Sequence, residues 1–431
     1  MLACFSFVAR YYSILSGFAV LSKFCYNLNM KSMLVVSDFF IGGGLETRIL
    51  EQVKVYQQHG VKCYLAADEY SEELAEKFDG VIKLPLRASD RGTIISNVDA
   101  LVNFCRDNEV EMIDAQPLYG VIAAGFASAI LHLPMCFTLH GQHNTPWLAD
   151  DPLLTLFHLV LELRRPQIVL VAEYLKEFYP EFLAGKDVKV VRNGIILPEK
   201  TAREAKGRKW IFASRLSGPK HELPLGAIPV LEKAGVEQLD IFGRGDEERH
   251  VKDFAEAYNS DATHKMRVNF RGWCDSVVDE ILQGEYEGGI GMDRVAVEMM
   301  STGLPVIILG YGGLTEGVSA DNFEKLIQDN WSSREKFDEA EMICSIEDVR
   351  QNPEKYDMRE MVAERLDSEK IWAERLKEVE DLKTDLGRDA MITTVWQDYY
   401  ENEARAREIE QLRAQLDKTF AQRIKQTLRK K

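Results

Sequence analysis

The strongest constraint on the fold is a pattern that the chain repeats twice: short apolar segments alternate with longer amphipathic ones. In the first half the apolar segments are 33–37, 61–66, 112–115, 135–139, 168–171 and 188–191. In the second half they are 210–213, 239–242, 268–270, 288–291 and 306–309. Strands that alternate with helices indicate βαβ units and a mostly parallel sheet. We therefore predict two doubly wound, Rossmann-like α/β domains that face a cleft.

A turn-rich, charged stretch separates the two series. It begins at Asn193-Gly194, passes Pro198 and carries many charges up to Lys209, which is typical of an interdomain linker. This places an N-terminal domain at residues 30–197 and a C-terminal domain at residues 205–382. Ligands of doubly wound sheets bind at the carboxyl ends of the strands, often between domains, so we expect the site in the cleft.

The remaining residues, 383–431, predict a charged helical extension. Residues 401–431 carry one apolar stripe, formed by Ile409, Leu412, Leu416, Phe420, Ile424 and Leu428. Such a stripe can pack on the parent domain or on a second copy of the chain. A basic amphipathic helix can also lie on an anionic membrane surface. An oligomer and a peripheral membrane contact through this segment are therefore both open.

The first 29 residues raise a separate question. Only Arg10 and Lys23 are charged there, and the apolar stretch between them is about a dozen residues, short of the roughly 20 that cross a bilayer. A small-residue cleavage site of the A-x-A type is absent at the expected place. Residues 1–29 could precede a true start at Met30, form an interfacial anchor, or be a cleaved export signal.

Composition narrows the class of function. The chain has 53 Lys+Arg against 69 Asp+Glu and a formal net charge of −16, which disfavours nucleic acid as a partner because that affinity comes largely from basic side chains that neutralise phosphates. The seven Cys include no C-x-x-C pair, so neither a zinc site nor a disulfide framework is indicated. We expect a cytoplasmic protein; a peripheral position at the inner membrane surface stays open because of the tail.

Residues 42–48 (GGGLETR) form the first of four segments suited to binding a substrate. They follow a predicted strand and open a predicted helix. Gly43 and Gly44 would let the backbone approach a ligand closely, and a helix N-terminus offers N–H groups to phosphate. A simple tight turn is the alternative.

The second segment, FASRLSGPKHEL, places Arg215 just after a strand and Lys220 five residues later. Both cations could converge on a diphosphate, Arg through its planar guanidinium and Lys as a point charge. Two unrelated surface cations would give the same spacing, so the pattern alone leaves both interpretations open.

The third segment spans residues 289–318. It carries Glu298 on a predicted helix, then a turn at Gly312-Gly313 ahead of Glu316. A carboxylate can accept hydrogen bonds from the two hydroxyls of a ribose, and glycine turns can present N–H groups to phosphates. Apolar residues surround Glu298 in the sequence, so its carboxylate needs a partner.

The fourth segment, FTLHGQHNTPW, places His140 at the end of a strand and His143 in the loop beyond. Two histidines without an accompanying Cys or acidic cluster do not make a zinc site. We expect His140 to be a hydrogen-bonding group in the cleft, and His143 to be structural or exposed.

In their order and spacing, these segments resemble the GT-B glycosyltransferases of the large retaining family (group 1, family 4-like) that includes bacterial glycan α-glycosyltransferases. The resemblance runs from about residue 33 to residue 382. It is carried by GGGLETRILEQVKVYQQHG, FTLHG, VVRNGI, FASRLSGPKHE, LDIFGRGDE, VNFRGW and VAVEMMSTGLPVIILGYGG. The last of these is the most specific, being similar to the block L-E-A-M-A-x-G-x-P-V-V-x-x-x-x-G-G.

The resemblance implies that the C-terminal domain binds a nucleotide-diphosphate sugar, with a UDP-sugar favoured, and that the N-terminal domain binds most of a glycan or lipid-linked acceptor. It implies that Arg215 and Lys220 hold the diphosphate and stabilise the leaving group, and that His140 lies beside the transferred sugar. It also implies retention of the anomeric configuration without a bound metal or cofactor. The implied substrate-binding residues are Gly43, Gly44, Asn193, Glu298, Gly312, Gly313 and Glu316.

One position departs from the family pattern, which commonly has two carboxylates eight residues apart. Eight positions before Glu298 stands Ile290, so either Asp293 or Arg294 holds the sugar instead, or activity is lost. We predict a hexosyltransferase-type enzyme of surface polysaccharide or glycolipid synthesis. A non-catalytic GT-B subunit of a glycosyltransferase complex and a sugar-nucleotide epimerase are the alternatives.

Overall fold

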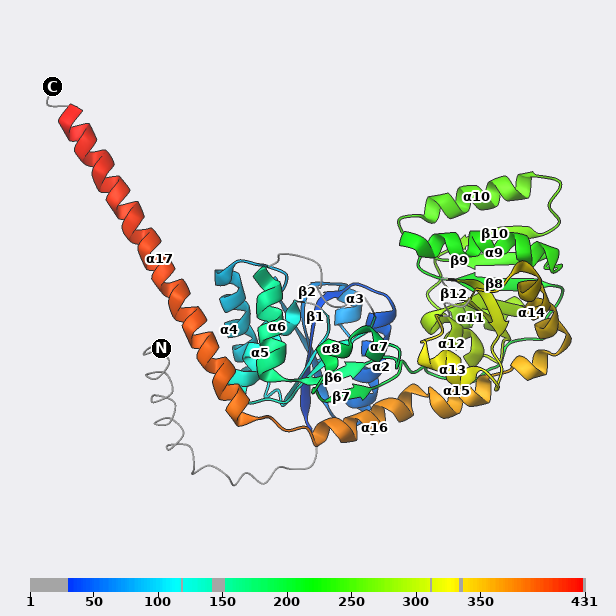
Figure 1. Ribbon diagram of the computed structural model, residues 1–431, viewed down its shortest axis with the longest axis horizontal. Helices are drawn as coiled ribbons and strands as arrows, with labels where there is room; N and C mark the ends of the chain where they lie inside the picture. The colour runs from blue at the N-terminus through cyan, green and yellow to red at the C-terminus, as the bar shows by residue number, and fades with distance from the viewer. Residues whose placement is uncertain (1–29, 118, 142–151, 311, 333–335, 429–431) are drawn as a thin grey trace.

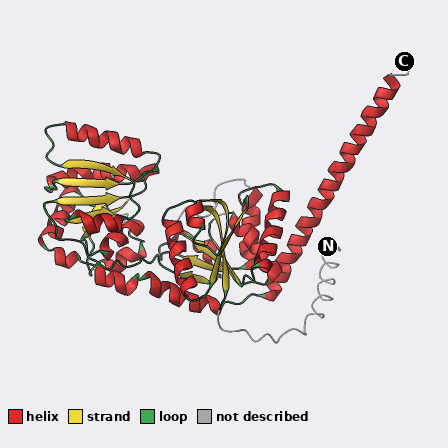
Figure 2. Ribbon diagram, turned by 180° about the vertical axis from the view of Figure 1, so that it is seen from behind, coloured by secondary structure: helices red, strands yellow, loops and turns green. Residues whose placement is uncertain are grey.

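The computed structural model describes residues 30–428 apart from 118, 142–151, 311 and 333–335. The predictions about residues 1–29 and about His143 lie outside the described residues. Figure 1 shows two α/β bodies and a long C-terminal helix that leads away from the first body. In Figure 2 the strands of each body lie inside and helices cover them. The predicted pair of Rossmann-like domains with a helical tail is confirmed.

The first domain contains a seven-stranded sheet in the order β3-β2-β1-β4-β5-β6-β7, and every pairing in it is parallel. Its strands are β1 (Ser32–Phe40), β2 (Lys62–Tyr70), β3 (Gly80–Lys83), β4 (Met112–Ala115), β5 (Met135–Leu139), β6 (Gln167–Leu170) and β7 (Val188–Val190). Its helices are α2 (Gly44–Gln58), α3 (Glu72–Ala75), α4 (Arg91–Asp107), α5 (Gly120–Leu131), α6 (Pro152–Arg164), α7 (Leu175–Phe178) and α8 (Pro180–Leu183). Every residue of β1 except Phe39 is buried, as expected for a central parallel strand with helices on both faces.

The second domain contains a six-stranded sheet in the order β10-β9-β8-β11-β12-β13. Its strands are β8 (Lys209–Ala213), β9 (Gln238–Phe242), β10 (Arg267–Gly272), β11 (Gly288–Gly291), β12 (Val306–Gly310) and β13 (Gly313–Gly317). Only the edge strand β13 pairs antiparallel among the described strands. The helical segments are η1 (Gly218–His221), α9 (Glu222–Lys233), α10 (Glu248–Ser260), α11 (Val277–Gly284), α12 (Asp293–Ser301), α13 (Phe323–Gln328), α14 (Glu339–Gln351), η2 (Pro353–Tyr356) and α15 (Arg359–Arg365).

The chain passes from the first domain to the second after β7, and it returns to the first domain just before the helix that begins at Ser368. The two segments that cross between the domains are in contact with each other. The Ile195 N–H donates to the Leu366 carbonyl at 2.8 Å, and the Ser368 N–H donates to the Ile195 carbonyl at 3.0 Å. A Cβ added at Gly194 would lie 2.7 Å from the Ser368 Cα. This close approach requires glycine at the hinge.

Helix α16 (Ser368–Glu380) packs on the first domain, although the sequence grouped residues up to 382 with the second (Figure 1). Trp372, Leu376 and Val379 join the hydrophobic core beside α2. The Trp372 ring meets the Tyr56 ring edge-to-face, with 6.3 Å between centroids. Burial of this apolar face against α2 fixes the helix to the first domain.

Helix α17 (Leu386–Leu428) lies within the segment 383–431, which the sequence predicts to be helical, and its first turns cover an apolar surface of the first domain. Ile392 and Trp396 are buried against the first domain, and the carboxylate of Asp389 pairs with the buried Arg164 guanidinium at 3.1 Å. Further along, Ile409 and Leu412 are about half exposed. The side chains of the other stripe residues, 416, 420, 424 and 428, are not among those described. No helix among the described residues has the length and apolar character of a membrane span.

Candidate active site

The loop between β1 and α2, which we call the glycine loop (residues 42–44), needs glycine for its backbone conformation and for its close contact with the second domain. Gly42 and Gly43 have φ values of 125° and 154°, which favour glycine. A Cβ added at Gly43 would collide with the Arg215 guanidinium from the second domain. The buried Glu46 folds back on the loop and accepts the Ile41 N–H at 3.3 Å. The first residue of α2 is Gly44, whose added Cβ would meet open space.

Arg215 and Lys220 both follow β8 but contact different partners. The exposed Arg215 reaches the glycine loop of the first domain. The Lys220 ammonium lies 2.8 Å from the Asp293 carboxylate, at the first residue of α12. Among the described residues, no carboxylate is a partner of both Arg215 and Lys220.

Glu298 lies on α12 and takes part in an ion-pair cluster that joins the two domains. Its carboxylate accepts from Arg294 Nε at 2.9 Å. The same guanidinium pairs with Glu51 on α2 and donates to the Gly194 carbonyl at 3.0 Å. Ser368 Oγ donates to Glu51 at 3.0 Å. We refer to Glu51, Arg294, Glu298 and Ser368 as the interdomain ion cluster.

The interdomain ion cluster is shielded from water. The side chains of Glu51, Arg294 and Glu298 are 6%, 12% and 20% exposed. Burial raises the pKa of Glu298, and the neighbouring Arg294 opposes that shift. The carboxylates of Glu51 and Glu298 raise the pKa of Arg294 despite its burial. Arg294 is therefore the cation that keeps two carboxylates from different domains beside each other.

Ile290 lies inside strand β11 and is fully buried in the core of the second domain. Only Met292 stands between β11 and the first residue of α12. The chain thus enters the helix directly, with no loop at this point to carry a carboxylate into the cleft. The two substitutes considered from sequence already have partners: Asp293 pairs with Lys220, and Arg294 belongs to the interdomain ion cluster.

His140 follows β5 and belongs to a hydrogen-bond chain that includes Gln116 and Asp114. Its Nε2 lies 2.7 Å from Gln116 Oε1, and an amide oxygen only accepts, so Nε2 carries the proton. Gln116 Nε2 in turn donates to Asp114 at 3.0 Å. Burial lowers the pKa of His140 well below its usual value, and the nearby Arg48 adds to the shift. His140 is therefore a neutral imidazole of defined tautomer at physiological pH.

Asp114 and Gln116 were missed in the sequence, although DAQ at the end of the strand 112–115 could have indicated them. Burial raises the pKa of Asp114, while Arg48 and a hydrogen bond from Gln52 favour its charged form. Burial lowers the pKa of Arg48 to about 10, and its guanidinium lies 4.6 Å from the Trp372 ring centroid. This buried cation adds positive potential beside Asp114 and His140.

Among the described residues, no hydrogen bond or ion pair joins the other predicted substrate contacts to Arg215 or Lys220. Asn193 lies next to the hinge, and its Oδ1 is buried without a hydrogen-bond partner among the described residues. Gly312 and Gly313 turn the chain between β12 and β13, and Glu316 lies half-buried on β13 at the sheet edge. Gly313 has φ 108°, so the turn favours glycine. No hydrogen bond among the described residues joins this hairpin to Arg215 or Lys220.

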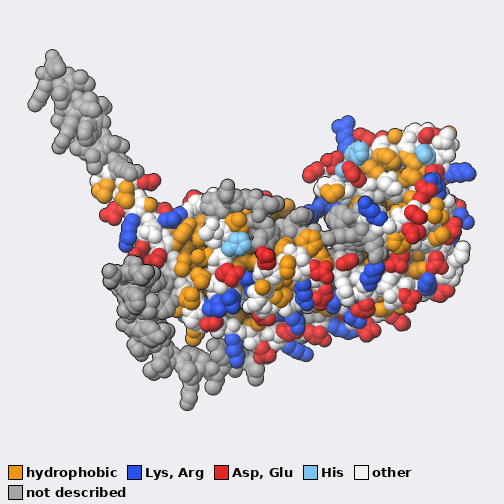
Figure 3. Space-filling model, in the orientation of Figure 1, with side chains coloured by type: hydrophobic (Ala, Val, Ile, Leu, Met, Phe, Trp, Pro, Cys, Tyr) orange, Lys and Arg blue, Asp and Glu red, His pale blue; other side chains and the backbone are white. Residues whose placement is uncertain are grey.

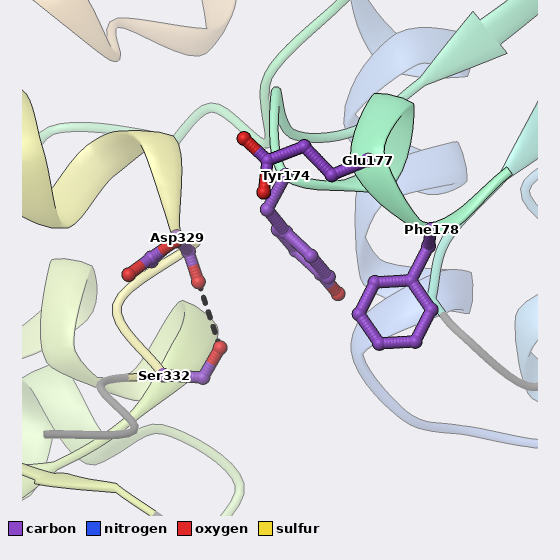
Figure 4. A pocket seen from close by; sticks show the side chains of 5 residues that line it. All are labelled: Tyr174, Glu177, Phe178, Asp329 and Ser332. Atoms are coloured by element: carbon purple, nitrogen blue, oxygen red, sulfur yellow. Dashed lines mark hydrogen bonds between the residues drawn. The ribbon is translucent and has the colours of Figure 1, made fainter. Parts of the chain in front are cut away.

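A pocket of about 390 Å³ lies between the domains, lined by Tyr174, Glu177, Phe178, Asp329 and Ser332. We call it the interdomain pocket. Figure 4 shows Tyr174 and Phe178 on one side and Asp329 and Ser332 on the other. No pattern in the sequence indicated it, because its walls come from separate domains. Among the described residues, no three His, Cys, Asp or Glu side chains are grouped to hold a metal ion.

Comparison with known proteins agrees with this architecture. Residues 42–197 match the family model described as Glycosyltransferase Family 4. No curated protein sequence matches the chain. Among solved structures, HepE of Anabaena in complex with UDP is similar at 15% identity over 82% of this chain and 100% of its own, with a TM-score of 0.60.

Two further solved structures have the same architecture. The lipopolysaccharide outer core galactosyltransferase WaaB, in its apo form, is 12% identical over 81% of this chain and 99% of its own, with a TM-score of 0.57. A glycosyltransferase from Rickettsia africae is 15% identical over 86% of this chain and 98% of its own, with a TM-score of 0.58. At these identities the likeness shows the fold, which is GT-B.

Proposed function

We propose that this GT-B protein is a glycosyltransferase that moves a sugar from a nucleotide-diphosphate sugar to a glycan or glycolipid. A UDP-sugar is the favoured donor and a cytoplasmic role in surface polysaccharide synthesis the favoured setting. The family match over residues 42–197 supports the transferase class. HepE was solved in complex with UDP, and WaaB is a galactosyltransferase of the lipopolysaccharide outer core; both support the proposed donor and acceptor classes.

The observation that carries the proposal is the approach of Arg215, from the second domain, to Gly43 in the loop that opens α2. A cation and a helix N-terminus there face the same space from two domains. Both features stabilise anionic oxygens, the cation by charge and the helix by its free N–H groups. A diphosphate bound between them would join the domains.

Lys220 supplies a second cation, which pairs with Asp293 in the structure. A bound diphosphate would compete with that carboxylate, because its oxygens carry more charge. During transfer, the bond between the sugar and the diphosphate breaks and negative charge grows on the leaving oxygen. Arg215 and Lys220 would stabilise that charge, which is the role that most lowers the barrier in such reactions.

His140 would contribute hydrogen bonding without charge, because its imidazole is neutral and its tautomer is fixed by Gln116. A neutral ring avoids attracting the diphosphate away from the cations. Retention of configuration, which the family resemblance implies, adds a further proposal. Proton NMR of the first product formed would report the anomeric configuration directly.

The proposal is tested with purified full-length protein in two steps. Thermal unfolding is followed with UDP, GDP and ADP, since a ligand at 100 times its Kd stabilises the folded state by about 2.7 kcal/mol. Transfer is then assayed with UDP-glucose, UDP-galactose, UDP-N-acetylglucosamine and GDP-mannose. A shift with UDP and release of UDP from one donor are expected. Absence of both overturns the proposal.

Ile290 favours a second candidate, a non-catalytic GT-B subunit. Its position inside β11 leaves no carboxylate where the family commonly has one, and Arg294 engages Glu298. This candidate predicts UDP binding without turnover of any donor, and turnover would dismiss it. Conversion of a donor in the absence of acceptor would indicate an epimerase instead.

A further inference from the structure

The interdomain pocket has the size of a small-ligand site and walls from both domains. Its volume of about 390 Å³ lies within the range usual for such sites. Tyr174, Glu177 and Phe178 come from the first domain, at and next to α7; Asp329 and Ser332 follow α13 in the second. The Tyr174 N–H donates to the Gln328 carbonyl at 3.2 Å, so a backbone hydrogen bond joins the two walls beside the pocket.

One wall is aromatic. The rings of Tyr174 and Phe178 meet edge-to-face, with centroids 6.1 Å apart. Phe178 is 42% exposed, although burial of such a ring is favourable. In Figure 4 both rings lie beside the pocket. Ring faces of this kind suit a ligand that has an apolar C–H surface, as a pyranose does.

The polar lining consists of acceptors and negative charge. Glu177 and Asp329 are exposed carboxylates, which accept hydrogen bonds and donate none. The Ser332 hydroxyl already donates to the Asp329 carbonyl at 2.7 Å. No Lys or Arg belongs to the described lining. The described lining therefore suits a ligand rich in hydroxyl donors and disfavours an anion.

The pocket lies next to the proposed diphosphate site. Trp331, in the turn that lines it, accepts the Asp293 N–H at 3.2 Å. Asn330 in the same turn lies 3.4 Å from the Asp293 carboxylate, which is the partner of Lys220. A ligand in the pocket would thus lie one turn of chain away from the cation that holds the donor.

We propose that the interdomain pocket is a subsite for an uncharged sugar of the acceptor. The aromatic wall binds the C–H face of the ring, and the carboxylates of Glu177 and Asp329 accept hydrogen bonds from its hydroxyls. The naming of this sugar as part of the acceptor rests on the proposed transferase function; the selectivity of the pocket for a neutral sugar rests on its lining alone. Because residues of both domains line the pocket, a bound sugar would also help to hold the two domains together.

Saturation-transfer NMR with the full-length protein tests the proposal. The probes are the methyl glycosides of glucose, galactose and mannose, with methyl glucuronide as the anionic counterpart. At least one neutral glycoside is expected to bind, and the glucuronide is expected to bind at least fivefold more weakly. Equal binding of the glucuronide, or binding of none of the neutral probes, overturns the proposal.

Variants locate the binding. Phe178→Ala is expected to weaken the neutral glycoside at least about fivefold, the loss that follows from removing one ring contact, while Phe178→Tyr retains it. The matched control is Tyr400→Ala, an exposed aromatic of α17, which should bind as the wild type does. The double variant Glu177→Gln, Asp329→Asn is expected to bind the glucuronide as well as the neutral sugar. Unchanged binding in Phe178→Ala overturns the assignment.

Calorimetry with UDP on the same samples separates the two proposals. All the pocket variants are expected to bind UDP as tightly as the wild type. If UDP and donor turnover are normal but no neutral glycoside binds, the pocket assignment is wrong and the transferase proposal stands. If a neutral glycoside binds in the pocket but UDP does not, the sugar subsite stands and the transferase proposal fails.

Discussion

The cleft-facing edges of the two sheets use polar groups in opposite ways. At the first sheet, a hydrogen-bond chain joins Asp114 and Gln116 to the neutral ring of His140. At the second, Lys220 pairs with Asp293 at a site about one-third exposed. The two edges therefore differ in what they offer a ligand. The first edge fixes the tautomer of His140, whereas at the second edge a ligand can replace Asp293 as the partner of Lys220.

The physical cause is the cost of burying charge. A charged imidazole in the first edge would lose hydration and be repelled by the Arg48 guanidinium, so the pKa of His140 is lowered and the ring stays neutral. An ion pair near water has a smaller desolvation cost and can change partners. Figure 3 shows acidic and basic side chains intermixed over this face of both domains, so surface charge by itself does not identify the site. The interdomain ion cluster, between these edges, is a charge network that is buried.

The largest effect is expected at that cluster. Arg294→Met leaves Glu51 and Glu298 buried without their cation, and removal of one partner from a buried ion pair costs about 3–5 kcal/mol. Urea unfolding monitored by circular dichroism gives the change in the free energy of unfolding. The control is Arg249→Met, because Arg249 is 92% exposed. If both variants unfold at the same urea concentration, the cluster contributes no stability. That result would contradict the distinction between the buried cluster and the more exposed Lys220–Asp293 pair.

The next effect concerns the exchangeable edge. Lys220→Ala and Arg215→Ala should each lower kcat of transfer by about 10²-fold, because each removes charge stabilisation of the leaving diphosphate. Steady-state kinetics with the donor identified in the transfer assay measures the change. Lys233→Ala, an exposed lysine paired with Glu339, is the matched control. Wild-type kcat in both cleft variants would contradict the assignment of this edge to the diphosphate.

The neutral imidazole of His140 should affect how the free energy of unfolding depends on pH. The native pKa of His140 is lowered, so below about pH 6.5 the unfolded chain binds a proton that the native protein does not. Stability therefore falls as the pH falls, by about 1 kcal/mol from pH 7.5 to 5.5 for this group. His140→Gln should reduce that loss, measured by urea unfolding at both pH values. The exposed His250→Gln should not, and an equal change in both variants would argue against a buried neutral ring.

The smallest effect tests whether a ligand can replace Asp293 as the partner of Lys220. Asp293→Asn frees Lys220 from its carboxylate, and asparagine tolerates the positive φ of 53° at this position. An ion pair near water is worth about 0.2–1 kcal/mol, so UDP should bind more tightly, by up to about fivefold. Isothermal titration calorimetry measures the Kd, with Asp253→Asn on the exposed face of α10 as control. Weaker binding in Asp293→Asn would show that Asp293 assists the ligand.

Much of the fold follows from local sequence pattern. The alternation of apolar runs located the central strands of both sheets, since a buried parallel strand is recognisable from its own residues. The edge strands β3 (GVIK) and β13 (GLTEG) were not predicted. Helix α16 was grouped with the wrong neighbour in space because its apolar stripe does not say which surface it covers. Contact with Tyr56 and the rest of α2 decided that.

The candidate site was predicted only in part. The sequence indicated Arg215 and His140 just after strands, Lys220 in the loop after Arg215, and Glu298 on a helix; the role of these residues in binding a donor stays a prediction. It did not indicate that Arg294 would join Glu298 to Glu51, which lies 243 positions away in the sequence. It did place Ile290 in a strand, because the predicted apolar segment 288–291 has the same bounds as β11.

Thus the sequence by itself determined two doubly wound domains, a charged helical tail and a set of polar groups at the ends of strands. These are properties of short segments, in which periodicity and residue type decide the outcome. The tertiary structure decided which charges meet, which tautomer His140 adopts and where a pocket opens between the domains. Those outcomes depend on distances between segments far apart in the chain, and on the water that packing excludes, neither of which any single segment encodes.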